Sequence, residues 1–307
     1  MIRFILYIIF IVLTGVYSIF AQIQQDEITI MNDSITLSGT LSYPQKNTPL
    51  IIWVHGSGNI DRNGNQGNII KANYIQQFRN EINKHGIAFF SYDKRTANKN
   101  NFKFLKNITY NDLYKDVLVT IDYFKKLNEF PEIVLIGHSQ GSLTAMLASK
   151  NITKFISIAG PSKPFDEILL DQITKGNPSL AGITKDHINE LKKTGKIEAI
   201  DPKLVTIFAK PNQQFLLFWM QYDPSKEIKK LLIPTLIING TKDLQVGVSE
   251  AQKLKQALPK AKLTLIPNMN HVLKEIKEDQ NNYPSYFSAD FPISTELIKT
   301  VVDFIKE

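Results

Sequence analysis

Cysteine is absent from this 307-residue sequence, and histidine occurs only five times. The absence of cysteine excludes disulfide bonds, thiol nucleophiles, cysteine-ligated zinc and a lipid-modified N-terminal cysteine. The sequence also lacks a basic stripe interleaved with aromatic residues, although its formal net charge is +7. Its lysines are scattered along the chain, a pattern that indicates a solvated surface rather than a nucleic-acid-binding site. No internal repeat or low-complexity tract divides the chain.

The N-terminus has the pattern of an export signal. Arg3 gives a short positively charged start, residues 4–16 form an apolar run, and Ala21 ends a segment suited to cleavage. This order is typical of a secretory signal peptide, so residues 1–21 are predicted to be removed and the mature protein to be periplasmic or secreted, without stable membrane insertion. Because the apolar run is nearly long enough to cross a bilayer, an uncleaved N-terminal membrane anchor is the alternative.

Short apolar runs alternate with segments of helical periodicity along most of the chain. Predicted strands occupy residues 50–54, 86–92, 132–136, 154–159, 233–239 and 263–266, and predicted helices occupy residues 72–84, 112–126, 142–148 and 294–305. A turn at residues 32–34 between two further apolar runs predicts an N-terminal hairpin. Strands that alternate with helices indicate an α/β fold with a mostly parallel central sheet and helices on both faces.

Residues 161–230 interrupt this alternation, because they contain no clear strand and are rich in helical patterns. A segment of that length within a compact domain is rarely a plain loop. The predicted organisation is therefore a core of residues 22–160 and 231–307 with a helical cap inserted at residues 161–230. The cap carries Phe215, Phe218 and Trp219, which are predicted to contribute to an apolar substrate pocket.

Residues Gly137–Gly141 form a G-x-S-x-G pentapeptide between a predicted strand and a predicted helix. A serine between two glycines at such a strand-to-helix turn is typical of the nucleophile elbow of α/β-hydrolases. Side chains at either glycine would collide with the neighbouring backbone of the tight turn. The pattern therefore predicts Ser139 as a nucleophile held at the carboxyl edge of the sheet.

A serine nucleophile needs a base within hydrogen-bonding reach, and in this fold the base follows the serine in the chain. His55 and His85 precede Ser139, His138 lies beside it, and His187 falls in the predicted cap. Only His271 remains, in the loop after the last predicted strand. Position and elimination together predict His271 as the general base.

The acid that orients the base should follow the strand before the last one. Asp243 lies directly after the strand predicted at residues 233–239 and is the predicted acid. Asp166, which follows the preceding strand, is the alternative.

An oxyanion hole needs two backbone N–H groups directed at the developing negative charge. The residue after the nucleophile, Gln140, is predicted to supply one of them. The other is predicted to come from Ser57, in the glycine-bracketed turn at residues 55–58 that follows the strand at residues 50–54.

The sequence resembles the EstD-type bacterial carboxylesterases, an α/β-hydrolase family often grouped with serine-aminopeptidase-like proteins. The resemblance extends over most of the mature chain and rests on residues 37–41, 55–58, 61–62, 92–95, 137–141, 222–224, 239–246 and 270–271. It implies an α/β-hydrolase fold and a triad of Ser139, Asp243 and His271. It also implies that small-molecule esters of short acyl or aryl groups are hydrolysed through an acyl-enzyme, without a metal or cofactor.

The sequence departs from the family pattern at Asn59, where proline is usual, and at residues 96–99, where a glycine is expected. Neither departure touches the triad, so both concern the shape of the pocket. Charged residues at 61–62 and 93–95 are expected to form an ion network with a mainly structural role. A serine peptidase, an acyltransferase and a non-catalytic binding module remain the alternatives, and the oligomeric state is open.

Overall fold

An eight-stranded sheet crosses the molecule in the computed structural model, which describes residues 22–307. The predicted signal peptide, residues 1–21, lies outside the described residues. The strand order across the sheet is β1-β2-β4-β3-β5-β6-β7-β8. These strands are β1 (Gln24–Asn32), β2 (Ile35–Tyr43), β3 (Leu50–Val54), β4 (Ala88–Tyr92), β5 (Ile133–His138), β6 (Lys154–Ile158), β7 (Thr235–Gly240) and β8 (Lys262–Ile266).

The sheet is antiparallel at one edge and parallel elsewhere. β1 pairs with β2 and β2 pairs with β4 in antiparallel register, whereas every pair from β4 through β3 to β8 is parallel. All residues of β3, β4 and β5 are buried, as expected for strands covered on both faces. The predicted mostly parallel sheet with an N-terminal hairpin is thus confirmed, and the carboxyl ends of the parallel strands meet at one edge.

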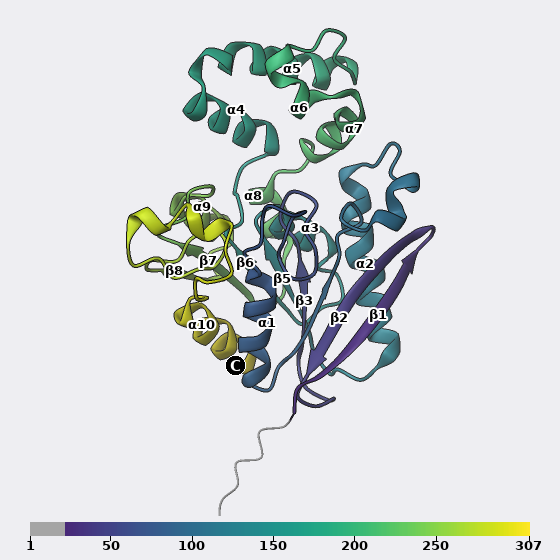
Figure 1. Cartoon of the computed structure of the whole chain (residues 1–307), viewed down its shortest axis with the longest axis vertical. Helices are drawn as coiled ribbons and strands as arrows, with labels where there is room; N and C mark the ends of the chain where they lie inside the picture. Colours follow the sequence, from purple (N-terminus) through teal and green to yellow (C-terminus); the bar gives the residue numbers. More distant parts are fainter. Residues whose placement is uncertain (1–21) are drawn as a thin grey trace, which may run out of the picture.

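Helices cover both faces of the sheet (Figure 1). α2, α3 and α9 pack on one face, while α1 and α10 pack on the other. The Thr109–Asp112 capping box begins α2, and Asn128 in a left-handed conformation ends it. The helices of the core are α1 (Tyr74–Lys84), α2 (Tyr110–Leu127), α3 (Gln140–Ala148), α9 (Val248–Ala257) and α10 (Thr295–Lys306), with short 3₁₀ helices at Lys99–Phe104, Asp279–Asn281 and Pro284–Tyr286.

Two local differences from the sequence prediction have simple causes. β7 begins at Thr235 rather than at residue 233, because Pro234 has no N–H to donate to the ladder. Helix α9 was not predicted. Only Ala251 and Leu254 of this helix are buried, so its apolar periodicity is too short to be recognised.

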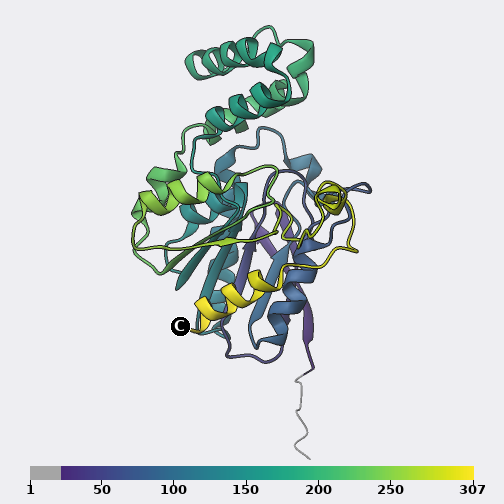
Figure 2. The same cartoon turned by 90° about the vertical axis from the view of Figure 1, so that its left-hand side faces the viewer.

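Residues 161–230 contain helices and no strand, and Figures 1 and 2 show most of them as a layer beyond the sheet. They have an apolar core of their own, which includes Leu191, Leu204 and Phe208. Trp219 joins a second cluster with Tyr110 of α2, which ties this layer to the core. Its elements are α4 (Phe165–Gly176), α5 (Ala181–Thr194), α6 (Val205–Phe208), α7 (Lys210–Trp219) and α8 (Pro224–Glu227), with 3₁₀ helices at Pro178–Leu180, Pro202–Leu204 and Ile228–Lys230.

Within residues 22–307, no helix is both long enough and apolar enough to cross a membrane. The predicted N-terminal export segment is not part of that range.

Candidate active site

Ser139 lies at the turn where β5 ends and α3 begins. Its backbone has φ 54° and ψ −123°, a conformation that non-glycine residues rarely adopt and that is typical of strained functional turns. The turn closes tightly: a Cβ at Gly137 would lie 2.4 Å from the Gly141 carbonyl oxygen, and one at Gly141 would lie 2.2 Å from that of Val54. The two glycines therefore allow the serine to be held at the carboxyl edge of the sheet.

Asp243 and His271 are brought together by the loops that follow β7 and β8. The Nδ1 atom of His271 lies 2.8 Å from Oδ2 of Asp243, and both side chains are almost completely buried. Oδ1 of Asp243 accepts hydrogen bonds from the backbone N–H groups of Gln245 and Val246, at 2.7 and 2.8 Å. The carboxylate is therefore fixed in orientation, and it holds the imidazole with its proton on Nδ1 and Nε2 free to accept.

The alternative acid, Asp166, lies elsewhere. It is in the first turn of α4 and pairs with Lys192 of α5, within the helical layer. The geometry thus brings Asp243, and not Asp166, to the predicted base.

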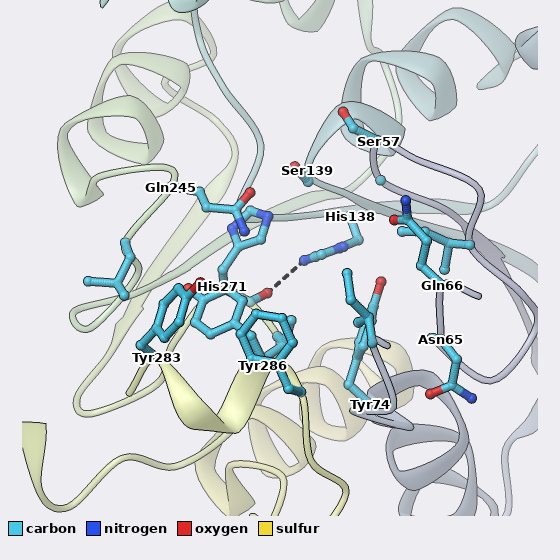
Figure 3. Close-up of a pocket in the computed structure, with 17 residues that line it drawn as sticks. Ser57, Asn65, Gln66, Tyr74, His138, Ser139, Gln245, His271, Tyr283 and Tyr286 are labelled. Atoms are coloured by element: carbon cyan, nitrogen blue, oxygen red, sulfur yellow. Dashed lines mark hydrogen bonds between the residues drawn. The ribbon is translucent and has the colours of Figure 1, made fainter. Parts of the chain in front are cut away.

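Ser139 and His271 line one cavity of about 380 Å³. Figure 3 shows the serine beside the His271 ring, at the edge of this cavity. Among residues 22–307, no hydrogen bond joins the Ser139 hydroxyl to the imidazole. Catalytic hydrogen bonds are often long in a site without substrate and tighten when substrate binds, so this geometry is compatible with a serine–histidine pair.

The predicted oxyanion-hole segments flank the serine. Gln140 is the first residue of α3, so its N–H has no acceptor within the helix. The loop after β3 lies close to the serine, because a Cβ at Gly56 would be 3.2 Å from Cβ of Ser139. Ser57 follows directly and borders the same cavity as Ser139. Two backbone amides are therefore near the position where charge would develop.

His138 has a supporting contact that the sequence did not reveal. Its Nε2 atom donates to the backbone carbonyl oxygen of His271 at 2.8 Å, drawn as the dashed line in Figure 3. Burial lowers the pKa of His138 to about 3, so the ring is neutral and its proton is on Nε2. The residue before the nucleophile thus holds the loop of the predicted base. No local pattern signals this contact, since the two residues are 133 positions apart.

His55 is also buried, but its role differs from that of His138. Neither of its ring nitrogens has a hydrogen-bond partner among the described residues, and it packs edge-on against Tyr92 with ring centroids 5.1 Å apart. Burial lowers the pKa of His55 to about 3, so it is a neutral packing group.

Aromatic residues surround the cavity beside His271. Tyr74, Tyr283, Tyr286 and Phe287 line it, and Figure 3 labels the three tyrosines. Tyr283 and Phe287 are exposed to solvent. The sequence prediction did not include these residues, because the segment that carries the last three follows the base loop and has no regular periodicity.

A second cavity, of about 550 Å³, lies between the core and the helical layer. It is bordered by Ser57 and Gln140 and, from α7, by Phe215 and Trp219. Phe218, the third predicted pocket residue, lines neither cavity and packs beside the cluster around Tyr110. The ring of Trp219 stacks on Tyr110 with centroids 5.5 Å apart and 1° between the planes. Contact of these aromatics with substrate stays a prediction.

The charged residues at 61–62 and 93–95 form ion pairs, leave Lys94 without one, and include Asp61, whose Oδ1 accepts from the backbone N–H groups of Asn63 and Asn65. Arg62 pairs with Asp93 at 2.8 Å, and Arg95 pairs with the buried Asp116 at 2.6 Å. Lys94 has no carboxylate partner in the described part of the chain. Its Nζ atom donates instead to the carbonyl oxygen of Gly56 at 2.8 Å and to Oε1 of Gln140 at 2.9 Å.

Nothing in residues 22–307 resembles a metal centre, because no three His, Asp or Glu side chains cluster in a way that could hold an ion. The chemistry that the site supports from its own residues is nucleophilic attack by serine, assisted by the imidazole–carboxylate pair and two backbone amides.

Comparisons with known proteins identify a family and several relatives of this chain. Residues 41–258 match the family model described as BD-FAE. The chain is 24% identical over 251 residues to the esterase EstD of Thermotoga maritima, an alignment that covers 77% of this chain and 58% of the relative. A putative esterase/lipase of Haemophilus influenzae is 23% identical over 251 residues, with 76% of this chain and 80% of the relative covered.

The solved structure of Est1E from Butyrivibrio proteoclasticus shares the fold. The TM-score is 0.57 at 18% sequence identity, and the match covers 92% of this chain and 99% of Est1E. At that identity the likeness concerns the fold alone. Together with the sheet order it confirms the predicted α/β-hydrolase fold.

Proposed function

This chain belongs to the BD-FAE family, and on that premise we propose that it is a serine carboxylesterase that hydrolyses short acyl or aryl esters. One observation carries the proposal: the strained serine at the elbow and His271, which is held by the buried carboxylate of Asp243, border the same cavity. The names of the two relatives, an esterase and a putative esterase/lipase, support it. The alignment with EstD spans less than two thirds of that relative, so the activity is proposed from the site as well as from the similarity.

In the proposed mechanism, Ser139 Oγ attacks the ester carbonyl carbon while its proton passes to Nε2 of His271. The backbone amides of Ser57 and Gln140 stabilise the negative charge on the carbonyl oxygen. His271 then protonates the departing alcohol, which leaves an acyl group on Ser139. A water molecule, deprotonated by His271, attacks the acyl-enzyme and releases the carboxylic acid. Asp243 keeps the imidazole in the required tautomer and stabilises its charged form.

The two cavities favour an ester with apolar groups on either side of the reacting carbonyl. The aromatic cavity borders His271, and the second cavity borders Gln140 and the α7 aromatics. Ligand pockets of this kind bury apolar groups and use few polar contacts for orientation. We therefore expect small esters with short acyl or aryl groups to fit better than charged substrates.

The test is hydrolysis of p-nitrophenyl esters of increasing chain length, beside aminoacyl p-nitroanilides, by the wild type and Ser139→Ala. Ester turnover that is lost in Ser139→Ala supports the proposal. Ser142→Ala is the matched control, because Ser142 lies on the same helix and its buried hydroxyl bonds to Ser157 Oγ at 2.7 Å. Turnover of the anilides in place of the esters would instead identify a peptidase, and no turnover of either would contradict the proposal.

We also propose that the protein is exported, on the strength of the sequence of residues 1–21. The measurement is N-terminal sequencing of the protein after expression with its own leader. A mature chain beginning at Gln22 supports export with cleavage. An intact N-terminus on membrane-associated protein supports the anchored alternative.

A further inference from the structure

Lys94 is a buried lysine that bridges the two segments of the oxyanion hole. Its residue is only 8% exposed, and its Nζ atom donates to the Gly56 carbonyl oxygen and to the Gln140 side chain. It comes from the loop after β4, whereas its partners come from the loop after β3 and from the start of α3. One ammonium group therefore connects two loops and the start of α3 at the carboxyl edge of the sheet.

The bond to Gly56 has a geometric consequence. The carbonyl of Gly56 and the N–H of Ser57 belong to the same peptide unit, and in a planar trans peptide they point in opposite directions. Lys94 holds the carbonyl oxygen, so the Ser57 N–H must point away from Lys94. A hydrogen bond to the carbonyl also polarises the peptide and makes its N–H a stronger donor. Gly56 can otherwise rotate more freely than any residue with a side chain.

The bond to Gln140 fixes the other donor. Gln140 is the first residue of α3 and is buried, and its side-chain oxygen is held by the same ammonium group at 2.9 Å. The residues that carry the two amides predicted to stabilise the oxyanion are thereby linked through the Nζ atom of Lys94. An oxyanion hole acts through donors placed in advance, so small changes in their position reduce the rate.

No unpaired carboxylate among the described residues compensates for the burial of the Lys94 ammonium group. The negative charge of Asp116 favours the charged form of Lys94, but that carboxylate is paired with Arg95. His55, which also faces it, is neutral. Burial lowers the pKa of Lys94 to about 7, which reflects the cost of placing the ammonium there. An aliphatic side chain would avoid that cost.

We propose that Lys94 is a positioning residue that holds the Ser57 and Gln140 amides in the oxyanion-hole geometry by bridging the Gly56 carbonyl and the Gln140 side chain. This inference rests on the proposed function, because it concerns the rate of the same reaction. Lys94 would set the orientation of the Gly56–Ser57 peptide without touching the reacting atoms of the substrate.

The experiment compares Lys94→Met, which cannot donate, with the wild type on the best p-nitrophenyl ester. Loss of the bridge should lower kcat by about 10- to 100-fold and leave KM within about threefold, because an oxyanion hole stabilises the transition state more than the substrate. Lys154→Met is the matched control. Its Nζ atom likewise donates two hydrogen bonds, to the backbone carbonyls of Phe304 and Ile305, but Lys154 starts β6 at the opposite end of the sheet.

A second variant keeps the test decisive if Lys94→Met does not fold. Gln140→Met removes the Oε1 acceptor and retains the backbone amide, and it should lower kcat by about 3- to 10-fold. A folded Gln140→Met with an unchanged kcat contradicts the proposal. Where Lys94→Met folds, the two losses in the double variant should be less than multiplicative, because both substitutions remove the same bridge. Fully independent effects of the two substitutions contradict the proposal.

The outcomes separate this inference from the proposed function. A wild type that neither hydrolyses esters nor reacts with a fluorophosphonate at Ser139 would contradict both the proposed function and the role of Lys94. An active wild type with a folded Lys94→Met whose kcat is within threefold of normal overturns only the role of Lys94. Equal losses of kcat in Lys94→Met and Lys154→Met also overturn it, since they would show a general effect of destabilisation.

Discussion

Replacement of Asp243 by asparagine should block the reaction by forcing His271 into the wrong tautomer. Oδ1 of Asp243 accepts from the backbone N–H groups of Gln245 and Val246, while Oδ2 faces Nδ1 of His271. In the asparagine variant, the side-chain oxygen must take the Oδ1 position, because an NH₂ group there would oppose two donors. The amide NH₂ then faces Nδ1, which must become an acceptor, so the proton moves to Nε2 and the ring cannot accept the proton of Ser139.

The size of the effect follows from the two hydrogen bonds that lock the amide. Rotating it would forfeit two bonds of about 1 kcal/mol each. It would also leave the two N–H groups facing the amide NH₂, at about 1–2 kcal/mol each, the lower part of the usual range because the Gln245 bond is exposed and the Val246 bond only partly buried. The productive tautomer is therefore disfavoured by about 4–6 kcal/mol. Since 1.36 kcal/mol is a factor of ten in rate, kcat should fall by about 10³- to 10⁴-fold. A loss of about that size accompanies the same substitution in the serine-protease triad.

The assay is steady-state hydrolysis of the best p-nitrophenyl ester, with thermal unfolding to verify that the variant is folded. Asp223→Asn is the control. The carboxylate of Asp223 caps α8 by accepting from the N–H of Ser225 at 3.0 Å, and asparagine preserves that bond. Activity of Asp223→Asn should remain within about twofold of the wild type. A folded Asp243→Asn that retains more than about a tenth of kcat would refute the tautomer argument.

Three further predictions concern stability, each measured by urea unfolding. Gly141→Ala places a Cβ 2.2 Å from the Val54 carbonyl oxygen and should cost about 3 kcal/mol or more; a loss below 1 kcal/mol contradicts the packing argument. His55 and His138 have pKa values of about 3 against 6.5 for the free side chain, so the unfolded chain binds more protons between these pH values. Stability should therefore fall on acidification from pH 6.5 to 3, by up to about 1.4 kcal/mol per pH unit for each ring, and substituting either should flatten the slope. The pKa of Lys94 is about 7 in the folded protein against 10.5 for the free side chain, so the unfolded chain binds more protons between these pH values. As the pH is raised from 7 to 10.5, the wild type should therefore gain stability relative to Lys94→Met, by up to about 1.4 kcal/mol per pH unit. A stability difference that does not change with pH would contradict this prediction.

The elbow could be predicted from the sequence because its constraints are local. Two glycines, a serine, a preceding apolar strand and a following helix all lie within about 20 consecutive residues, and each restricts the backbone of its neighbours. The same is true of the parallel strands, whose short apolar runs are recognisable one by one. Helix α9 was missed because only Ala251 and Leu254 of it reach the core.

The acid and base could be placed only by their order in the chain and the strands they follow. That order left Asp166 as an alternative to Asp243, and the sequence cannot measure which of them reaches His271. The structure separates them, since Asp243 lies 2.8 Å from the imidazole and Asp166 pairs with Lys192 in the helical layer. The pocket aromatics show a similar limit: Phe215 and Trp219 border a cavity, but Phe218 on the same helix does not.

The sequence by itself determined the fold class and the residues able to carry the chemistry, because backbone constraints and hydrophobic periodicity act between near neighbours. Only the tertiary structure decided which other side chains hold the predicted catalytic residues and oxyanion-hole amides in place. His138 reaches the carbonyl of His271 across 133 positions, and Lys94 reaches Gly56 and Gln140 across 38 and 46. Such contacts form where loops from separate strands converge at one edge of the sheet. A buried N–H donor bonds to whichever acceptor the packing brings within about 3 Å, and the neighbouring residues in the sequence do not predict which acceptor that is.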